Sequence, residues 1–271
     1  MKLAETIPYA QLLLRLARVE LRINDIPIAL KDTDGITNIM TPIREFLVSG
    51  RNSARFTVAP DDIPQAYKEG GDVIQEGSAV RMRIAQVEDG EFLDFVVGEE
   101  LLDIAVRLSS QDVPPITRSG TFEAKAVHRW AWTMAQKIDP VRDRKTINAF
   151  VGKVSEMFAT LDAAGLIEAM QPSIADRAKA YPMIDEHHRK LDIRNALGRQ
   201  DPKTWKPMPF DPDRALYRSV AEGRLIQPLD LDGLPLVRTE TDTLADPAAS
   251  PGYYPFPMMI GYKGGELAIL L

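Results

Sequence analysis

In the first part of the chain, apolar residues recur at every second position. Within residues 11–22 this alternation shifts by one residue between Leu16 and Val19, as it does in a strand that contains a β-bulge. Residues 24–25 and 32–35 are typical turn residues. We therefore expect two short strands, joined by one tight turn and ended by the other.

The same alternation predicts further strands. Phe56 and Val58 alternate with polar neighbours, and residues 80–85 alternate between apolar side chains and arginines. Apolar runs follow at residues 92–97 and 101–108, after a turn. Several short strands with turn residues between them are typical of a small antiparallel β-sandwich.

A resemblance supports this prediction. The order of strands and turns in LRINDIPI and PIREFLVSGRNSARFTV, within residues 12–60, resembles bacterial jelly-roll-type sandwich modules, which occur in many carbohydrate-binding or accessory domains. The resemblance implies a sandwich fold. It assigns no binding residues, because one fold hosts many functions.

The hydrophobic period changes after a stretch that contains two consecutive prolines and a Ser-Gly pair, at residues 111–120. Prolines and glycines of this kind separate structural elements. We therefore predict a β-sandwich-like domain over residues 1–112, a linker over 113–120 and an α+β domain over 121–271.

Helical spacing dominates the first half of the second domain. A first helix is predicted to begin at Thr121 and to end near Asp139. Residues 143–169 show apolar positions three and four apart, which predicts one long amphipathic helix. Another helix is expected over 172–197 with an interruption at a proline, and a short one over 211–220.

The end of the chain returns to period two. One hairpin is predicted around the turn at 230–233 and another around 263–265. Helices followed by hairpins, over 121–271, resemble the cone-shaped folds similar to nuclear transport factor 2, in which helices cover a curved antiparallel sheet. The predicted fold class is α+β: an N-terminal antiparallel β-sandwich followed by a helical domain ending in antiparallel β-hairpins.

Composition limits the chemistry. The sequence has no cysteine, which excludes disulfides, thiolate nucleophiles and cysteine metal sites. The net charge of -6, without a segregated basic region, argues against a nucleic-acid partner. Arg15 and Arg18 interrupt the apolar run near the N-terminus, so we expect no signal peptide, no membrane span and a cytoplasmic protein.

Two histidine positions are the candidates for acid–base chemistry. Asp185 and His188 lie three apart on one face of a predicted helix, and His128 lies elsewhere in the chain. Two protein ligands do not make a zinc site, so we expect no metal and no cofactor. A solvated turn of helix is the alternative interpretation of Asp185 and His188.

An aromatic, proline-stiffened segment is the candidate binding surface. It combines Tyr253, Tyr254 and Phe256 with Trp205, and such residues form binding rims for a protein or a sugar ring. Core packing is the alternative for the same residues.

The leading functional hypothesis is a non-enzymatic binding or protein-interaction protein, because no catalytic motif is present in the sequence. The first alternative is a small-molecule enzyme of hydrolase or isomerase type, with its pocket in the C-terminal domain and His128 or His188 as acid or base. The second is a carbohydrate-binding accessory protein.

Overall fold

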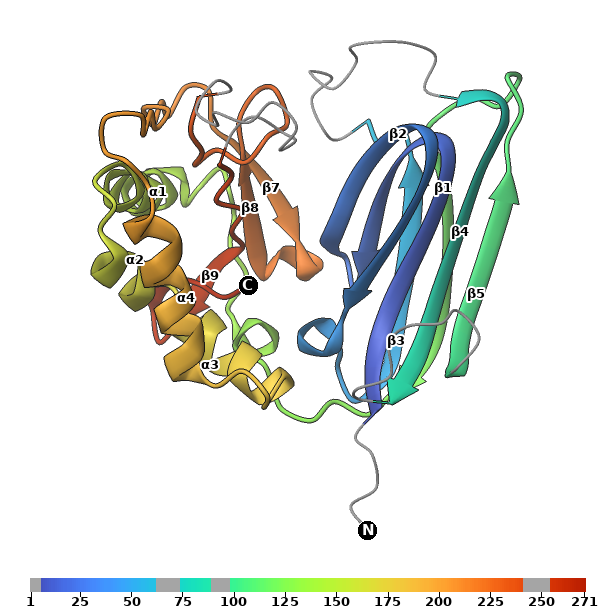
Figure 1. Ribbon diagram of the computed structural model, residues 1–271, viewed down its shortest axis with the longest axis horizontal. Coiled ribbons are helices and arrows are strands. Elements are labelled where there is room, and N and C mark those ends of the chain that lie inside the picture. The colour runs from blue at the N-terminus through green and yellow to red at the C-terminus, as the bar shows by residue number, and fades with distance from the viewer. Residues whose placement is uncertain (1–5, 62–73, 89–97, 241–253) are drawn as a thin grey trace. The chain divides into compact units, whose positions relative to one another are not determined.

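The chain is an α+β protein, as the sequence predicts. The computed structural model describes residues 6–61, 74–88, 98–240 and 254–271. It divides into two compact units, Met1–Val127 and His128–Leu271, called here the N-terminal unit and the C-terminal unit. An antiparallel sheet forms the first, and four α-helices and a second antiparallel sheet form the other (Figure 1).

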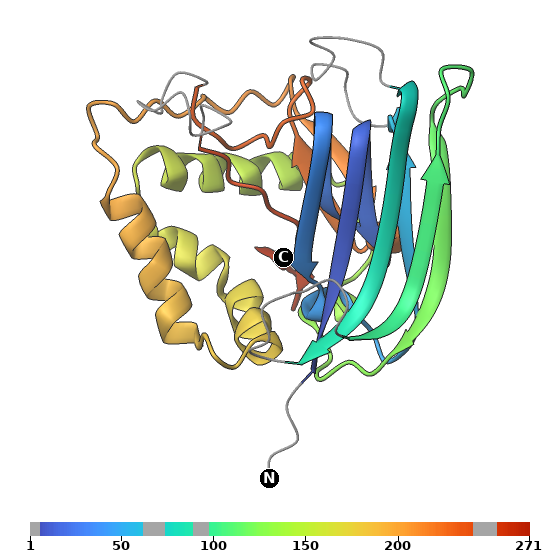
Figure 2. The same cartoon turned by 45° about the vertical axis from the view of Figure 1, so that its right-hand side comes forward.

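The sheet of the N-terminal unit branches at its first strand. Its six strands are β1 (Thr6–Ile23), β2 (Ile26–Pro42), β3 (Gly50–Val58), β4 (Ile74–Glu88), β5 (Glu99–Arg107) and β6 (Ile116–Ala124). One edge of β1 pairs with β2. The other edge pairs first with β4 and then with β3, and β5 and β6 extend these two branches. Figure 2 shows the long strands side by side.

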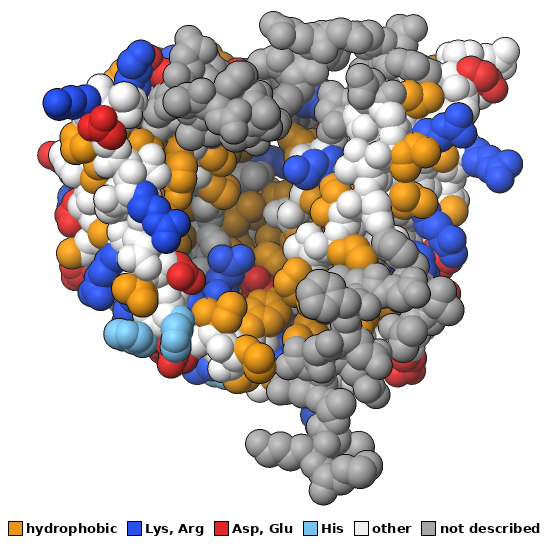
Figure 3. Space-filling view, viewed as in Figure 1, with side chains coloured by type: hydrophobic (Ala, Val, Ile, Leu, Met, Phe, Trp, Pro, Cys, Tyr) orange, Lys and Arg blue, Asp and Glu red, His pale blue; other side chains and the backbone are white. Residues whose placement is uncertain are grey.

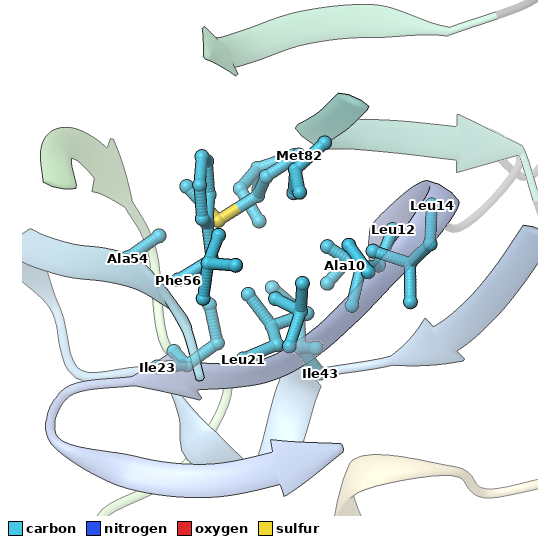
Figure 4. Close-up of a cluster of buried hydrophobic side chains, with 14 of the residues drawn as sticks. Ala10, Leu12, Leu14, Leu21, Ile23, Ile43, Ala54, Phe56 and Met82 are labelled. Atoms are coloured by element: carbon cyan, nitrogen blue, oxygen red, sulfur yellow. The ribbon is translucent and has the colours of Figure 1, made fainter. Parts of the chain in front are cut away.

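The two branches fold over each other and enclose the core. A Cβ added at Gly120 of β6 would lie 2.7 Å from Leu102 and 2.9 Å from Ile104, both on β5. This close approach makes the sheet sandwich-like. Side chains such as Phe56 and Met82 fill the space between the branches (Figure 4).

Local sequence signals predict the β1–β2 hairpin correctly. A bulge is present as expected, but it lies at Leu16 itself rather than between Leu16 and Val19, since Leu16 has a φ of 50° and the register shifts between Arg15 and Ala17. The predicted turn at Asn24 and Asp25 is also present, with φ values of 50° and 65°. Such left-handed values suit a tight hairpin turn.

The turn predicted at residues 32–35 is wrong, because β2 continues through it. Thr33 pairs with Ala17 and Ile36 pairs with Arg15. The residues between these pairs lie opposite the bulge of β1, so the turn-forming residues occupy an irregular point of one strand. A 3-10 helix, η1 (Arg44–Phe46), then links β2 to β3.

The helix predicted from Thr121 is wrong as well. Strand β6 occupies most of the segment predicted as a linker, 113–120, and continues to Ala124. Ile116 and Phe122 belong to the core of the N-terminal unit, so this core extends past the paired prolines. Residues 116–124 form a strand because they pair with β3 along its whole length. This pairing outweighs the weak helical preference of the segment from Thr121 onward.

The C-terminal unit begins with a 3-10 helix, η3 (Ala131–Met134), and then contains α1 (Arg144–Ala159), α2 (Ala163–Ala169), α3 (Gln171–Ala180) and α4 (Glu186–Gly198). The single helix predicted over 143–169 is thus two helices. Leu161 has a φ of 56°, and the Asp162 carboxylate accepts a hydrogen bond from the Gly165 amide at 3.0 Å. This cap begins a new helix. The predicted interruption near Pro182 is confirmed.

The second sheet has four strands in the order β10-β9-β8-β7. They are β7 (Leu216–Val220), β8 (Leu225–Leu229), β9 (Ile260–Lys263) and β10 (Glu266–Ile269). The helix predicted over 211–220 is wrong, because β7 pairs with β8 along its whole length. The hairpin predicted around 263–265 is confirmed, with positive φ at both of its glycines.

The turn predicted at 230–233 is present, since the Gly233 amide donates to the Asp230 carbonyl at 2.8 Å. Its predicted hairpin is reduced to one isolated bridge between Leu229 and Pro235. The core of this unit packs α1 and the sheet together; it includes Ile147, Val154, Phe158, Ile226 and Ile260.

Candidate functional site

His128 lies beside a buried carboxylate in the C-terminal unit. Its Nε2 atom is 3.7 Å from Oδ1 of Asp176 and 3.0 Å from Nζ of Lys179; both partners lie on α3. The Ala131 amide donates to the other Asp176 oxygen at 2.6 Å. The ring of the buried Trp130 meets the imidazole edge to face at 5.4 Å.

This arrangement brings together groups suited to proton transfer. A lysine ammonium only donates hydrogen bonds, so the 3.0 Å contact with Lys179 needs the His128 Nε2 atom as its acceptor. The imidazole is about one-third exposed. Acid–base work at Nε2 requires Lys179 to move away first.

Asp185 and His188 form a helix cap. The Asp185 carboxylate accepts from the His188 amide at 2.9 Å and lies 2.8 Å from its Nδ1. These hydrogen bonds hold the pKa of Asp185 below its ordinary value. Both side chains are about two-thirds exposed. Figure 3 shows histidine side chains, in pale blue, at the surface.

Among the residues that the structure describes, no three histidine, aspartate or glutamate side chains gather in a way that could hold a metal ion.

The aromatic candidates pack against one another in the C-terminal unit. Trp205 is 8% exposed, and its indole donates to the Phe158 carbonyl at 3.1 Å. The Trp205 ring lies 4.9 Å from Phe158 and 5.5 Å from Tyr254, between centroids, and Phe256 lies 5.7 Å from Phe158. Tyr254 and Phe256 are partly buried against the core. Tyr253 lies outside the described residues.

A further candidate is the outer face of the N-terminal sheet. Strands β5, β4, β1 and β2 lie side by side, and every second residue points away from the core. We call this surface the basic face. Its registered rows are Arg107–Ala79–Arg15–Ile36, Ala105–Arg81–Leu13–Asn38 and Asp103–Arg83–Gln11–Met40.

The basic face combines exposed cations with exposed apolar side chains. Leu13 is 38% exposed and Ile36 is 74% exposed. Arg15 and Arg107 are exposed too. Over β4 and β5, Figure 3 shows hydrophobic side chains in orange close to basic ones in blue.

Two arginines of the basic face are held by carboxylates and two are not. Arg81 donates from Nε to Asp103 at 2.9 Å and lowers the pKa of that carboxyl. Arg83 pairs with Glu100 at 2.9 Å. Within the described part of the chain, Arg15 and Arg107 form no ion pair and no side-chain hydrogen bond.

The basic face was not predicted as a site from the sequence. The alternating arginines of residues 80–85 were a usable signal, and the same alternation continues in residues 13–15 and 105–107. The missing information was the register, which places Arg107 and Arg15 on either side of Ala79.

Comparison with known proteins returns no matching family model, no matching curated protein and no matching solved structure. Neither resemblance noted from the sequence is therefore supported at family level. Separately, none of the helices in the described ranges has the length and apolar character needed to cross a membrane.

Proposed function

We propose that this protein is a non-enzymatic binding protein whose basic face binds an acidic protein partner. One observation carries the proposal. Two exposed arginines without carboxylate partners in the described chain, Arg15 and Arg107, share a sheet face with the exposed apolar residues Leu13 and Ile36.

Charge complementarity selects the partner. Among the described side chains of this face, Arg81 and Arg83 are paired with Asp103 and Glu100, whereas Arg15 and Arg107 add positive charge to it, although the whole chain has a net charge of -6. An acidic partner is therefore attracted to this face and repelled by the average surface, which orients the encounter. Burial of Leu13 and Ile36 then contributes affinity.

The test uses a fluorescent peptide of alternating glutamate and leucine, and its lysine–leucine counterpart, in anisotropy titrations. We expect the acidic peptide to bind the wild type, and Arg15→Glu/Arg107→Glu to weaken binding by at least about a hundredfold, since each lost charge-assisted contact is worth about 1.5–3 kcal/mol. Arg118→Glu, an exposed change on β6 of the same unit, is the matched control and should bind normally. Equal binding of both peptides, or an unaffected double variant, refutes the proposal.

A second candidate function, a small-molecule enzyme, is favoured by the contact of His128 with Asp176 and Lys179. In a screen of hydrolase and isomerase substrates, it predicts a turnover that His128→Gln removes and His188→Gln leaves intact. Turnover that is unchanged in His128→Gln rejects this role for the imidazole.

The carbohydrate-binding alternative for the N-terminal sheet requires a different probe from tryptophan fluorescence. All three tryptophans of the sequence, Trp130, Trp132 and Trp205, belong to the C-terminal unit and are buried. Calorimetry with glycans is the suitable measurement.

A further inference from the structure

We infer that Arg15 and Arg107 together bind one compact dianionic group of phosphate type above Ala79. This inference rests on the proposed function, because it specifies the chemical group through which the basic face recognises its partner. Its basis is the position of these three residues in one row across β1, β4 and β5.

The row geometry allows both arginines to reach one group. Ala79 pairs directly with Arg15 on one side and with Arg107 on the other, so the two arginines start about 10 Å apart, two inter-strand spacings. An arginine side chain is longer than one such spacing. The alanine methyl leaves the space between them open, so the two guanidinium groups can converge above it.

Within the described part of the sheet, the neighbouring arginine is neutralised by its own carboxylate. Arg81 lies in the next row, diagonal to both arginines, but Asp103 binds it through Nε and Nη2. The free positive charge therefore comes from Arg15 and Arg107. Both side chains are exposed, so packing against apolar residues does not hold the guanidinium groups of Arg15 and Arg107 in place.

A phosphate-type group fits this position better than a single carboxylate. It carries a charge of about -1.5 to -2 at neutral pH and three acceptor oxygens. Guanidinium groups bind such oxygens in pairs, so one arginine can bind from each side. The group comes either from a phosphorylated side chain of the protein partner or from free phosphate.

The first measurement titrates inorganic phosphate into the full chain and follows the arginine Nε–Hε signals by NMR. We expect saturable shifts for Arg15 and Arg107, with smaller shifts in sodium chloride of equal ionic strength. Ala79→Leu should remove the shifts by filling the space, and the melting temperature of this variant shows whether it remains folded. Arg15→Gln should remove the shift of Arg107. Shifts that chloride reproduces, or that persist unchanged in Ala79→Leu, overturn the inference.

A second measurement identifies the source of the group and separates the two proposals. A phosphoserine peptide that binds about tenfold more tightly than its glutamate version, with a gain lost in Arg15→Gln and in Arg107→Gln alike, supports a phosphorylated partner. Phosphate shifts without that gain support free phosphate. Binding of acidic peptides without any phosphate response refutes this inference alone. A phosphate response without acidic-peptide binding refutes the proposed function instead.

Discussion

Asn52 shows how one buried amide organises the turn region of the N-terminal unit. Its side chain is 1% exposed. The amide oxygen accepts from the Val48 backbone at 2.8 Å and from the Asn24 side chain at 2.7 Å. The amide nitrogen donates to the carbonyls of Val48 and Gly50 at 2.9 and 2.8 Å. The Asn52 side chain thus provides hydrogen-bond partners for backbone groups at the start of β3 and links this segment to the β1–β2 turn.

Replacing Asn52 by alanine should therefore be costly. Each buried polar group left without a partner costs about 1–3 kcal/mol, so we expect a loss of at least about 2 kcal/mol in the free energy of unfolding. Urea unfolding followed by circular dichroism measures it. The exposed neighbour Ser53 provides the control, since Ser53→Ala removes no side-chain bond seen in the structure. An equal effect of both changes would contradict this role.

Asp230 is a buried carboxylate held by two arginines in the C-terminal unit. Burial works to raise its pKa, but hydrogen bonds from Arg214 and the Leu231 amide, together with the charge of Arg238, outweigh burial and hold the pKa below its ordinary value. Arg238 lies 3.0 Å away and is itself buried, at 4% side-chain exposure.

This lowered pKa predicts a pH dependence of stability. A carboxylate with a depressed pKa stabilises the fold above its unfolded-state pKa, about 3.9, and the contribution is lost as the pH falls from there through the folded-state pKa. Asp230→Asn should therefore destabilise the unit at pH 7 and reduce the loss of stability below about pH 4. Urea unfolding at pH 7 and pH 3 tests this, with the exposed Asp213→Asn as control. If the free energy of unfolding of Asp230→Asn fell between pH 7 and pH 3 by as much as that of the wild type, Asp230 would not be the source of this pH dependence.

Among the elements, the close contact of β5 and β6 depends on Gly120. An added Cβ would lie under 3.0 Å from methyl groups of Leu102 and Ile104. Overpacking of this kind costs about 1–3 kcal/mol, so Gly120→Ala should lower the thermal midpoint. Gly35→Ala is the matched control within the same unit, since nothing lies within 4 Å of its added Cβ. Equal midpoints for the two variants would show that the strands separate at no cost.

The elements also show what local sequence can predict. The bulge at Leu16 and the turn at Asn24 follow from the residues themselves, because they need a period shift and a left-handed backbone. Strands β6 and β7 were not predicted. Strand β6 depends on pairing with β3, which lies far away in the chain, and a short segment does not encode such a partner. Strand β7 forms a hairpin with β8, which follows it directly, so its partner was close at hand in the sequence.

For the whole molecule, two separate cores predict two responses to mutation. Phe158 lies in the core of the C-terminal unit and Phe56 in that of the N-terminal unit. Phe158→Ala should cost about 3–5 kcal/mol and shift the unfolding transition seen by tryptophan fluorescence. Phe56→Ala should shift the circular dichroism of the sheet and leave the fluorescence transition in place. Coincident transitions in both variants would show that the chain unfolds as one cooperative unit.

The fold class of the whole molecule was predictable, whereas the candidate site was not. Alternation and helical spacing suffice for an α+β chain with a sheet at each end. The basic face depends on which strands are neighbours and in what register, and only the assembled sheet places Arg15 and Arg107 around Ala79.

The position of β1 has a consequence for synthesis of the protein. Strands β1 and β2 are joined by a two-residue turn, so this hairpin can form once its residues leave the ribosome. The opposite edge of β1 must wait for β3 and β4, which follow later in the chain. A nascent chain therefore exposes a long hydrogen-bonding edge until those strands arrive, and a pause in translation within that interval favours aggregation.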